Sequence, residues 1–152
     1  MNKKVFGRKL SRSRPAREAL FSALIRSMIL SGKIVTTRAK AKAIQGDLEH
    51  MITLAKKADL TSRRKALAYL DNAKEIVELL FNQVGPFFST RTSGFTRIIS
   101  LPERRGDNAK MARIEWTEKV ELKAKEPKVK VKKAAKEDKK TVKKITAKKT
   151  AK

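Results

Sequence analysis

Residues 93–117 read SGFTRIISLPERRGDNAKMARIEWT, and their side-chain pattern is typical of two β-strands joined by a loop. Over residues 112–116 apolar side chains alternate with charged ones, which is the two-residue period of a strand. Over residues 95–101 one face would carry Phe95, Arg97, Ile99 and Leu101, and the other Thr96, Ile98 and Ser100. The eight residues between the strands, PERRGDNA, predict a hairpin loop with Arg104 and Arg105 at its tip. These two strands favour a fold that contains a β-sheet.

The chain before this hairpin predicts two long helices and one more strand. Residues 15–31 begin with Pro and repeat apolar side chains at three- and four-residue spacings until a Ser-Gly pair, as an amphipathic helix does. Residues 33–37, KIVTT, form a β-branched run that predicts a third strand ending at a Thr cap. Residues 38–59 predict a second amphipathic helix. Its apolar stripe consists of Ile44, Leu48, Met51, Ile52 and Ala55.

Two shorter helices are predicted between the second long helix and the hairpin. Thr61 or Ser62 is expected to cap the first, and a capping-box-like pair, Asn72 and Glu75, is expected to start the second. A Gly-Pro dipeptide at residues 85–86 is expected to end it. The sequence therefore predicts a small two-layer α+β domain in the order helix, strand, helices, two strands, with the helices on one face of the sheet.

Charge divides the chain into two parts. Its 152 residues carry 39 Lys and Arg against 15 Asp and Glu, a net charge of +24. All 13 arginines and every aromatic residue lie in residues 1–122, which we expect to form one domain. Residues 123–152 hold 14 lysines, three acidic residues and few large apolar side chains. We expect this tail to be a disordered polycation, because it cannot offset the entropy of ordering.

Residues suited to catalysis or metal binding are scarce. The only histidine, His50, falls on the side of its helix away from the apolar stripe and is expected to be solvated. Cysteine is absent, so neither a thiolate metal site nor a disulfide can form. No G-x-S-x-G motif or Gly-rich phosphate loop surrounds the Ser and Thr residues. We therefore predict no enzymatic activity, no catalytic residue, no metal, no cofactor and no small-molecule substrate.

Twelve cationic residues gather in places that suit phosphate binding: the N-terminal arm, the opening turns of the second long helix, the segment STRTSGFTR and the hairpin tip. Small residues separate the cations of the arm, so its backbone can follow an irregular surface while each guanidinium makes bidentate contacts. The candidates are Arg8, Lys9, Arg12, Arg14, Arg17, Arg38, Lys40, Lys42, Arg91, Arg97, Arg104 and Arg105. The alternative is that the basic arm is only solvated, but this would leave the basic clusters elsewhere in the chain unexplained.

RNA is the expected polyanion, because basic loops distributed around a small domain suit a folded RNA better than one duplex groove. A strand between the two long helices also argues against a helix-turn-helix. The rival hypothesis is a DNA-compacting, histone-like polycationic protein, which the Lys-rich tail suggests. An enzyme that acts on RNA would need a site that the sequence does not offer. A membrane span is excluded because 18 apolar residues never occur together, and Arg26 within the apolar run disfavours a secretory peptide.

Several motifs resemble the bacterial-type large-subunit ribosomal protein seventeen family. The most specific is the pair GFTRI at 94–98 and RRGDNAKMARIEW at 104–116. Shorter matches are GRKLSR at 7–12, TTRAKAK at 36–42 and ITLAKK at 52–57. The resemblance covers residues 1–118 and leaves the Lys-rich tail outside the shared pattern.

The resemblance implies a structural protein bound to large-subunit rRNA near the rim of the peptide exit tunnel, beside large-subunit ribosomal proteins thirty-two and twenty-two. It also implies the helix, strand, helices, two-strand order and a location in a cytoplasmic ribosome, with an organellar ribosome left open. Phosphate-positioning roles would then fall to Arg8, Lys9, Arg12, Arg38, Lys40, Arg97, Arg104 and Arg105.

Overall fold

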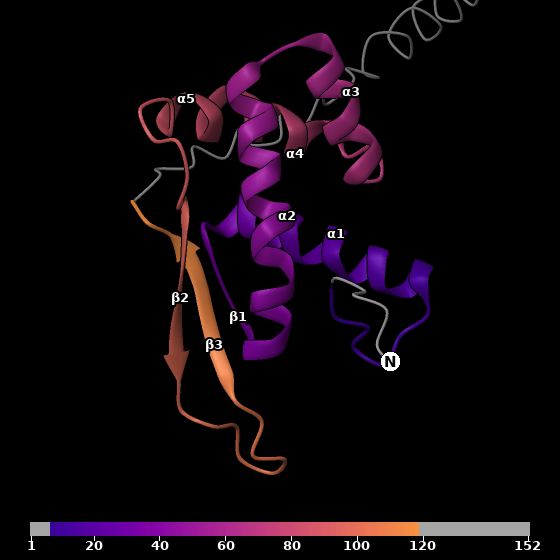
Figure 1. The fold of residues 1–152 in the computed structure, drawn as a ribbon, viewed down its shortest axis with the longest axis vertical. Coiled ribbons are helices and arrows are strands. Elements are labelled where there is room, and N and C mark those ends of the chain that lie inside the picture. The colour runs from indigo at the N-terminus through magenta and orange to yellow at the C-terminus, as the bar shows by residue number, and fades with distance from the viewer. Residues whose placement is uncertain (1–6, 119–152) are drawn as a thin grey trace, which may run out of the picture.

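The predicted α+β fold is confirmed by a computed structural model that describes residues 7–118 (Figure 1). Residues 1–6 and 119–152, which include the predicted Lys-rich tail, lie outside the described residues. In chain order the elements are α1 (Arg14–Ser31), β1 (Lys33–Thr37), α2 (Arg38–Lys57), α3 (Leu60–Tyr69), α4 (Lys74–Leu79), a π-helical segment η1 (Leu80–Val84), α5 (Gly85–Phe87), β2 (Thr96–Leu101) and β3 (Met111–Trp116).

The sheet is antiparallel and has the strand order β1-β3-β2. The last strand, β3, is therefore central and pairs with both of the others. Its residue Ile114 lies opposite Ile34 of β1 and opposite Ile98 of β2. Ala112, Ile114 and Trp116 are buried while the residues between them are only partly covered, so the alternation in the sequence is that of a sheet with one face in the core.

Helix α2 covers the buried face of this sheet and runs alongside all three strands (Figure 1). The predicted apolar stripe is confirmed, because each of its members is at most 3 % exposed: Ile44, Leu48, Met51, Ile52 and Ala55. On the opposite face of the sheet, Val35 is 59 % exposed and Arg97 is also exposed. The long helix thus holds the strands from one side, and its first turn lies next to the base of the β2–β3 hairpin.

Both predicted caps of the shorter helices are wrong. Asp59, and not Thr61 or Ser62, caps α3: its carboxylate accepts a hydrogen bond from the Thr61 N–H at 3.3 Å, and Ser62 is buried on the packed side of the helix. Helix α4 begins without any side-chain cap, because Asn72 has a left-handed backbone with φ 60° and belongs to the preceding turn. Helix α3 thus begins two or three residues before the predicted position at another favoured cap residue, and the left-handed turn at Asn72 removes that residue from the start of α4.

The Gly-Pro dipeptide at 85–86 does not end the helix, contrary to the prediction. The Gly85 N–H donates to the Leu80 carbonyl five residues back, so the turn widens into a π-helical segment and the chain continues helically through Phe87. A proline can occupy the next position because it begins a new helical turn. Glycine is required before it, since a Cβ at Gly85 would lie only 3.0 Å from the Ala55 carbonyl oxygen of α2.

Candidate nucleic-acid interface

The junction between β1 and α2 is tied to the base of the β2–β3 hairpin. Thr37 occupies the predicted cap position of α2, but its side chain makes no capping hydrogen bond. The Arg38 N–H instead donates to the Lys110 carbonyl at 2.9 Å. Strand pairing explains this contact, because Thr37 lies opposite Met111, the residue that follows Lys110. Residues separated by more than seventy positions in the sequence therefore meet at the start of α2.

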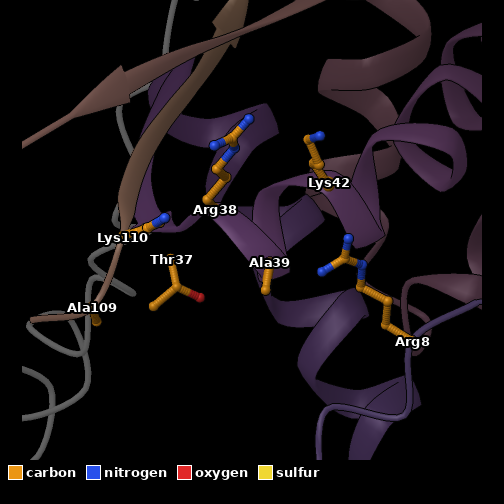
Figure 2. A pocket seen from close by; sticks show the side chains of 7 residues that line it. All are labelled: Arg8, Thr37, Arg38, Ala39, Lys42, Ala109 and Lys110. Atoms are coloured by element: carbon orange, nitrogen blue, oxygen red, sulfur yellow. The ribbon is translucent and has the colours of Figure 1, made fainter. Parts of the chain in front are cut away.

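A recess with a volume of about 380 Å³ opens at this junction, and Figure 2 shows its lining. The N-terminal arm contributes Arg8, the first turns of α2 contribute Arg38 and Lys42, and the end of the hairpin loop contributes Lys110. All four cationic side chains are exposed. We call this set the cationic recess. The remaining described residues that line it are uncharged: Thr37, Ala39 and Ala109.

Two sources of positive potential meet in the cationic recess. The first turn of a helix presents N–H groups without intrahelical partners and carries a partial positive charge of about half a unit. The first turn of α2 contains no acidic residue that would neutralise it, and it adds cationic side chains instead. Repulsion between these positive charges destabilises the protein alone. A bound polyanion would remove the repulsion and add attraction. A phosphate group suits the recess best, because it accepts hydrogen bonds from backbone N–H groups and guanidinium groups together.

The other predicted residues of the arm lie outside the recess. Arg12 turns back and donates to the Leu10 carbonyl at 2.8 Å. Arg14 pairs with Glu18 at 2.9 Å, and this hydrogen bond raises the pKa of Arg14. Lys9 is exposed, whereas Arg17 in α1 and Lys40 in α2 are half-buried.

Three of the four predicted arginines beyond residue 90 are held by carboxylates. Arg91 pairs with Glu118 at 2.7 Å, Arg97 pairs with Glu115 at 2.6 Å, and Arg104 donates two hydrogen bonds, of 3.1 and 2.5 Å, to Asp107. Hydrogen bonding from Arg104 lowers the pKa of Asp107 to about 2, and hydrogen bonding from Arg97 lowers the pKa of Glu115. The fourth, Arg105, is exposed at the hairpin tip and is absent from the ion pairs of residues 7–118.

Lys110 is the cation of the recess that sequence reasoning missed. It follows the hairpin loop, five residues after the arginine pair at the tip, and nothing in that spacing brings it near Arg38. The signal that could have found it is strand order, since pairing of β1 with β3 places the start of β3 beside the start of α2. Arg8, Arg38 and Lys42 were predicted as candidates, and the structure brings these three together.

Possible metal ligands do not gather in the described part of the chain. Residues 7–118 contain no group of three or more His, Asp or Glu side chains placed to hold a metal ion. His50 is exposed on α2, as predicted. None of the helices between residues 7 and 118 combines the length and hydropathy needed to cross a membrane.

Comparison with known proteins gives consistent matches. The family model described as Ribosomal protein L17 matches residues 20–117. A large ribosomal subunit protein bL17 from Symbiobacterium thermophilum is 48 % identical to this chain over 107 residues, which cover 70 % of this chain and 94 % of that protein. The protein of the same name from Hydrogenobaculum sp. is 44 % identical over 119 residues, which cover 78 % and 100 %. The relative from Oenococcus oeni is 43 % identical over 128 residues, which cover 73 % and 98 %.

Proposed function

Since this chain belongs to the ribosomal protein L17 family, we propose that its cationic recess binds backbone phosphates of the large-subunit rRNA. The chain is a structural protein of the large ribosomal subunit and not an enzyme. It would act by holding RNA segments in place, so no chemical step is required. Phosphate contacts position a protein on RNA without reading its sequence, so specificity would come from the shape of the folded RNA.

The observation that carries this proposal is the convergence of four cations on one helix N-terminus with no acidic residue among them. Arg8 and Arg38 can each form two parallel hydrogen bonds to a phosphate, whereas Lys42 and Lys110 act as point charges. The contact between the Arg38 N–H and the Lys110 carbonyl holds the helix and the hairpin base in a fixed relation. The backbones that carry Arg38, Lys42 and Lys110 are therefore held together before the RNA arrives, which lowers the entropic cost of binding.

Charge reversal in the recess tests the proposal. We expect the double variant Arg38→Glu, Lys42→Glu to fold normally and to be lost from large subunits during a high-salt sucrose gradient, whereas the unchanged chain stays with them. The control, Lys33→Glu with Lys74→Glu, reverses two exposed lysines that do not line the recess and should be retained. Normal retention of the recess variant would rule out the recess as an RNA site. Equal affinity of the unchanged chain for duplex DNA and rRNA would support the DNA-compaction alternative instead.

We further propose a position near the rim of the peptide exit tunnel, beside large-subunit ribosomal proteins thirty-two and twenty-two, in cytoplasmic ribosomes. The support is the family resemblance of the motifs GFTRI and RRGDNAKMARIEW. Crosslinking from a single cysteine at the exposed Ser93 can test it, because the chain contains no other cysteine. Crosslinks to either neighbour are expected, and crosslinks only to proteins distant from the tunnel would refute the position.

Five of the remaining candidate residues, and the tail, are proposed to add less specific contacts. We expect Lys9, Arg12, Arg17, Lys40 and Arg105 to contact further phosphates, and residues 123–152 to add screened attraction through 14 lysines. Deleting residues 123–152 should flatten the salt dependence of RNA affinity and leave the melting transition of the body unchanged. Loss of cooperative melting would show that the domain does not end near residue 122.

A further inference from the structure

A second basic surface lies on α3 and the last residue of α2, at the opposite end of α2 from the cationic recess (Figure 1). We define the α3 basic surface as Lys57, Leu60, Arg63 and Arg64. All four side chains are exposed, and Leu60, at 62 %, has the highest exposure among the large hydrophobic residues of the described chain. Residues 56–65 contain five cations and one acid, Asp59, whose carboxylate is engaged as the cap of α3.

The two arginines of this surface differ from those of the hairpin in what they contact. Arg63 lies over the ring of Phe81, with its guanidinium carbon 5.1 Å from the ring centroid. The ion pairs of residues 7–118 include neither Arg63 nor Arg64. Stacking on an aromatic ring fixes the plane of a guanidinium and leaves the N–H groups at its edge available. Arg63 is therefore held in place without an internal anion.

Helix α2 separates this surface from the recess. It is 20 residues long, from Arg38 at the recess to Lys57 at the α3 basic surface, which corresponds to about 30 Å at the rise of an α-helix. The packing of α2 against the sheet and against α3 makes this separation a fixed property of the fold.

We infer that the α3 basic surface binds backbone phosphates of a second RNA segment, so that α2 spaces two RNA segments apart within the large subunit. This inference rests on the proposed rRNA-binding function. An edge-exposed guanidinium pairs bidentately with a phosphate, as it also does with a carboxylate, and the neighbouring Leu60 can lie against an unpaired nucleotide. We choose RNA over an acidic protein because rRNA is the partner already proposed for the recess at the other end of α2. Binding at both ends would fix the distance between the two segments.

Directed cleavage can locate both segments, because the chain contains no cysteine and one introduced cysteine carries an iron chelate at a single place. Thr61→Cys puts the chelate on the exposed side of α3, and Ala109→Cys puts it at the recess. Each full-length variant is assembled with large-subunit rRNA, and the cleaved nucleotides are mapped. We expect cleavage from both positions, at two sets of nucleotides that do not overlap in the RNA sequence.

The outcomes separate the inference from the function on which it rests. Cleavage from Ala109→Cys alone would overturn the α3 site and leave the recess in place. If neither Thr61→Cys nor Ala109→Cys gave cleavage, both the α3 site and the proposed RNA site at the recess would be ruled out. Identical cleavage sets would mean that one RNA segment spans both surfaces, which contradicts the spacer role. Crosslinking of a label at Thr61→Cys to a neighbouring protein, with no RNA cleavage, would show that the α3 basic surface is a protein contact.

Salt-dependent affinity gives a second measurement that does not depend on the label. Each phosphate contact that is removed should lower the slope of log affinity against log salt by about one. We expect Arg63→Ala with Arg64→Ala to lower the slope for large-subunit rRNA by about two and to weaken binding at least tenfold at physiological salt. The matched control, Lys33→Ala with Lys74→Ala, removes the same charge elsewhere and should change the slope by less than one. Equal slopes for the two variants would overturn the inference.

Discussion

Arg38 in the cationic recess and Arg104 in the β2–β3 hairpin both belong to basic clusters, but their guanidinium groups have different surroundings. The residues that line the recess with Arg38 include no acid, whereas Arg104 makes two hydrogen bonds to Asp107. Arg97 and Arg91 resemble Arg104, since each is paired with a glutamate. The recess therefore offers charge that no internal partner satisfies, while much of the hairpin's positive charge is already used within the domain.

A count of the cations in the sequence therefore overstates the number of strong phosphate contacts that we expect. A phosphate that binds a paired arginine must displace or share the carboxylate, and the displaced carboxylate is then repelled by the phosphate. An unpaired arginine has only water to release. We therefore expect the largest contributions to RNA affinity from unpaired cations in the recess and on α3, and smaller ones from the paired arginines.

The largest effect is expected from a substitution that unfolds the domain and so separates the elements that form the recess. Leu48 is 1 % exposed on the buried stripe of α2, so Leu48→Asp should lower the free energy of unfolding by more than about 3 kcal/mol. Thermal melting followed by circular dichroism measures the change. His50→Asp places the same charge on the exposed side of the same helix and should cost less than about 1 kcal/mol. Similar melting of the two variants would show that α2 faces the other way.

The direct test of the comparison removes two cations from each region. Arg38→Ala with Lys42→Ala should weaken rRNA binding by about 3 kcal/mol, about 100-fold, because two charge-assisted hydrogen bonds are lost. Arg97→Ala with Arg104→Ala removes the same charge from paired positions and should cost less than tenfold. Filter-binding titrations at one salt concentration compare them. A larger loss for the hairpin pair would show that internal ion pairs do not limit phosphate binding.

The two arginines at the hairpin tip allow a paired and an unpaired guanidinium to be compared within a single loop. Arg105 is exposed and lies outside the ion pairs of residues 7–118, whereas its neighbour is bonded to Asp107. We expect Arg105→Ala to weaken rRNA binding about fivefold, close to 1 kcal/mol, and Arg104→Ala to weaken it less than twofold. Filter-binding titrations measure the affinity of both variants. A larger loss for Arg104→Ala than for Arg105→Ala would show that pairing with a carboxylate does not reduce phosphate binding.

The smallest effect concerns the pH dependence of the Arg104–Asp107 pair. Because the pKa of Asp107 is lowered to about 2, its stabilising contribution is fully present above the ordinary aspartate pKa near pH 4 and is lost as the pH falls through about 2. Carbon-detected NMR titration of the Asp107 carboxyl should give this low value, and Arg104→Ala should return it to about 4. Arg105→Ala should leave it unchanged. An ordinary pKa in the unchanged chain would show that the pair does not persist in solution.

Local sequence patterns predicted the long helices, the three strands and the apolar stripe of α2 because burial follows a strict period in each element. The same reasoning failed at the short helices. Asp59 caps α3 two or three residues earlier than expected, and α4 starts without a side-chain cap. At Gly85 a π-helical turn carries the helix past a proline, since the backbone there packs closely against Ala55. At α3 the prediction overlooked an equally favourable local cap, whereas at Asn72 and Gly85 contacts with a neighbouring turn or with α2 accompany the departure from the predicted pattern.

The candidate site divides in the same way. Arg8, Arg38 and Lys42 could be chosen from sequence because each belongs to a basic cluster. Their convergence with Lys110 could not, because it depends on β1 pairing with β3. The pairing of Arg91 and Arg97 with carboxylates was equally invisible, since Glu118 and Glu115 lie 27 and 18 positions away from them, whereas Asp107 is a local neighbour of Arg104 in the hairpin loop. The α3 basic surface was overlooked because its cations lie in a segment that the sequence marked only as a short helix.

Composition and periodicity were sufficient to predict a basic α+β domain and to suggest a polyanion as its partner, because net charge and burial period are carried by individual residues and their near neighbours. Which cations converge in the recess and which are paired with carboxylates inside the domain depends on the strand order β1-β3-β2 and on the packing of α2. Electrostatic interactions act through space over a few ångströms, so side chains that are remote in sequence become partners only once the fold brings them together.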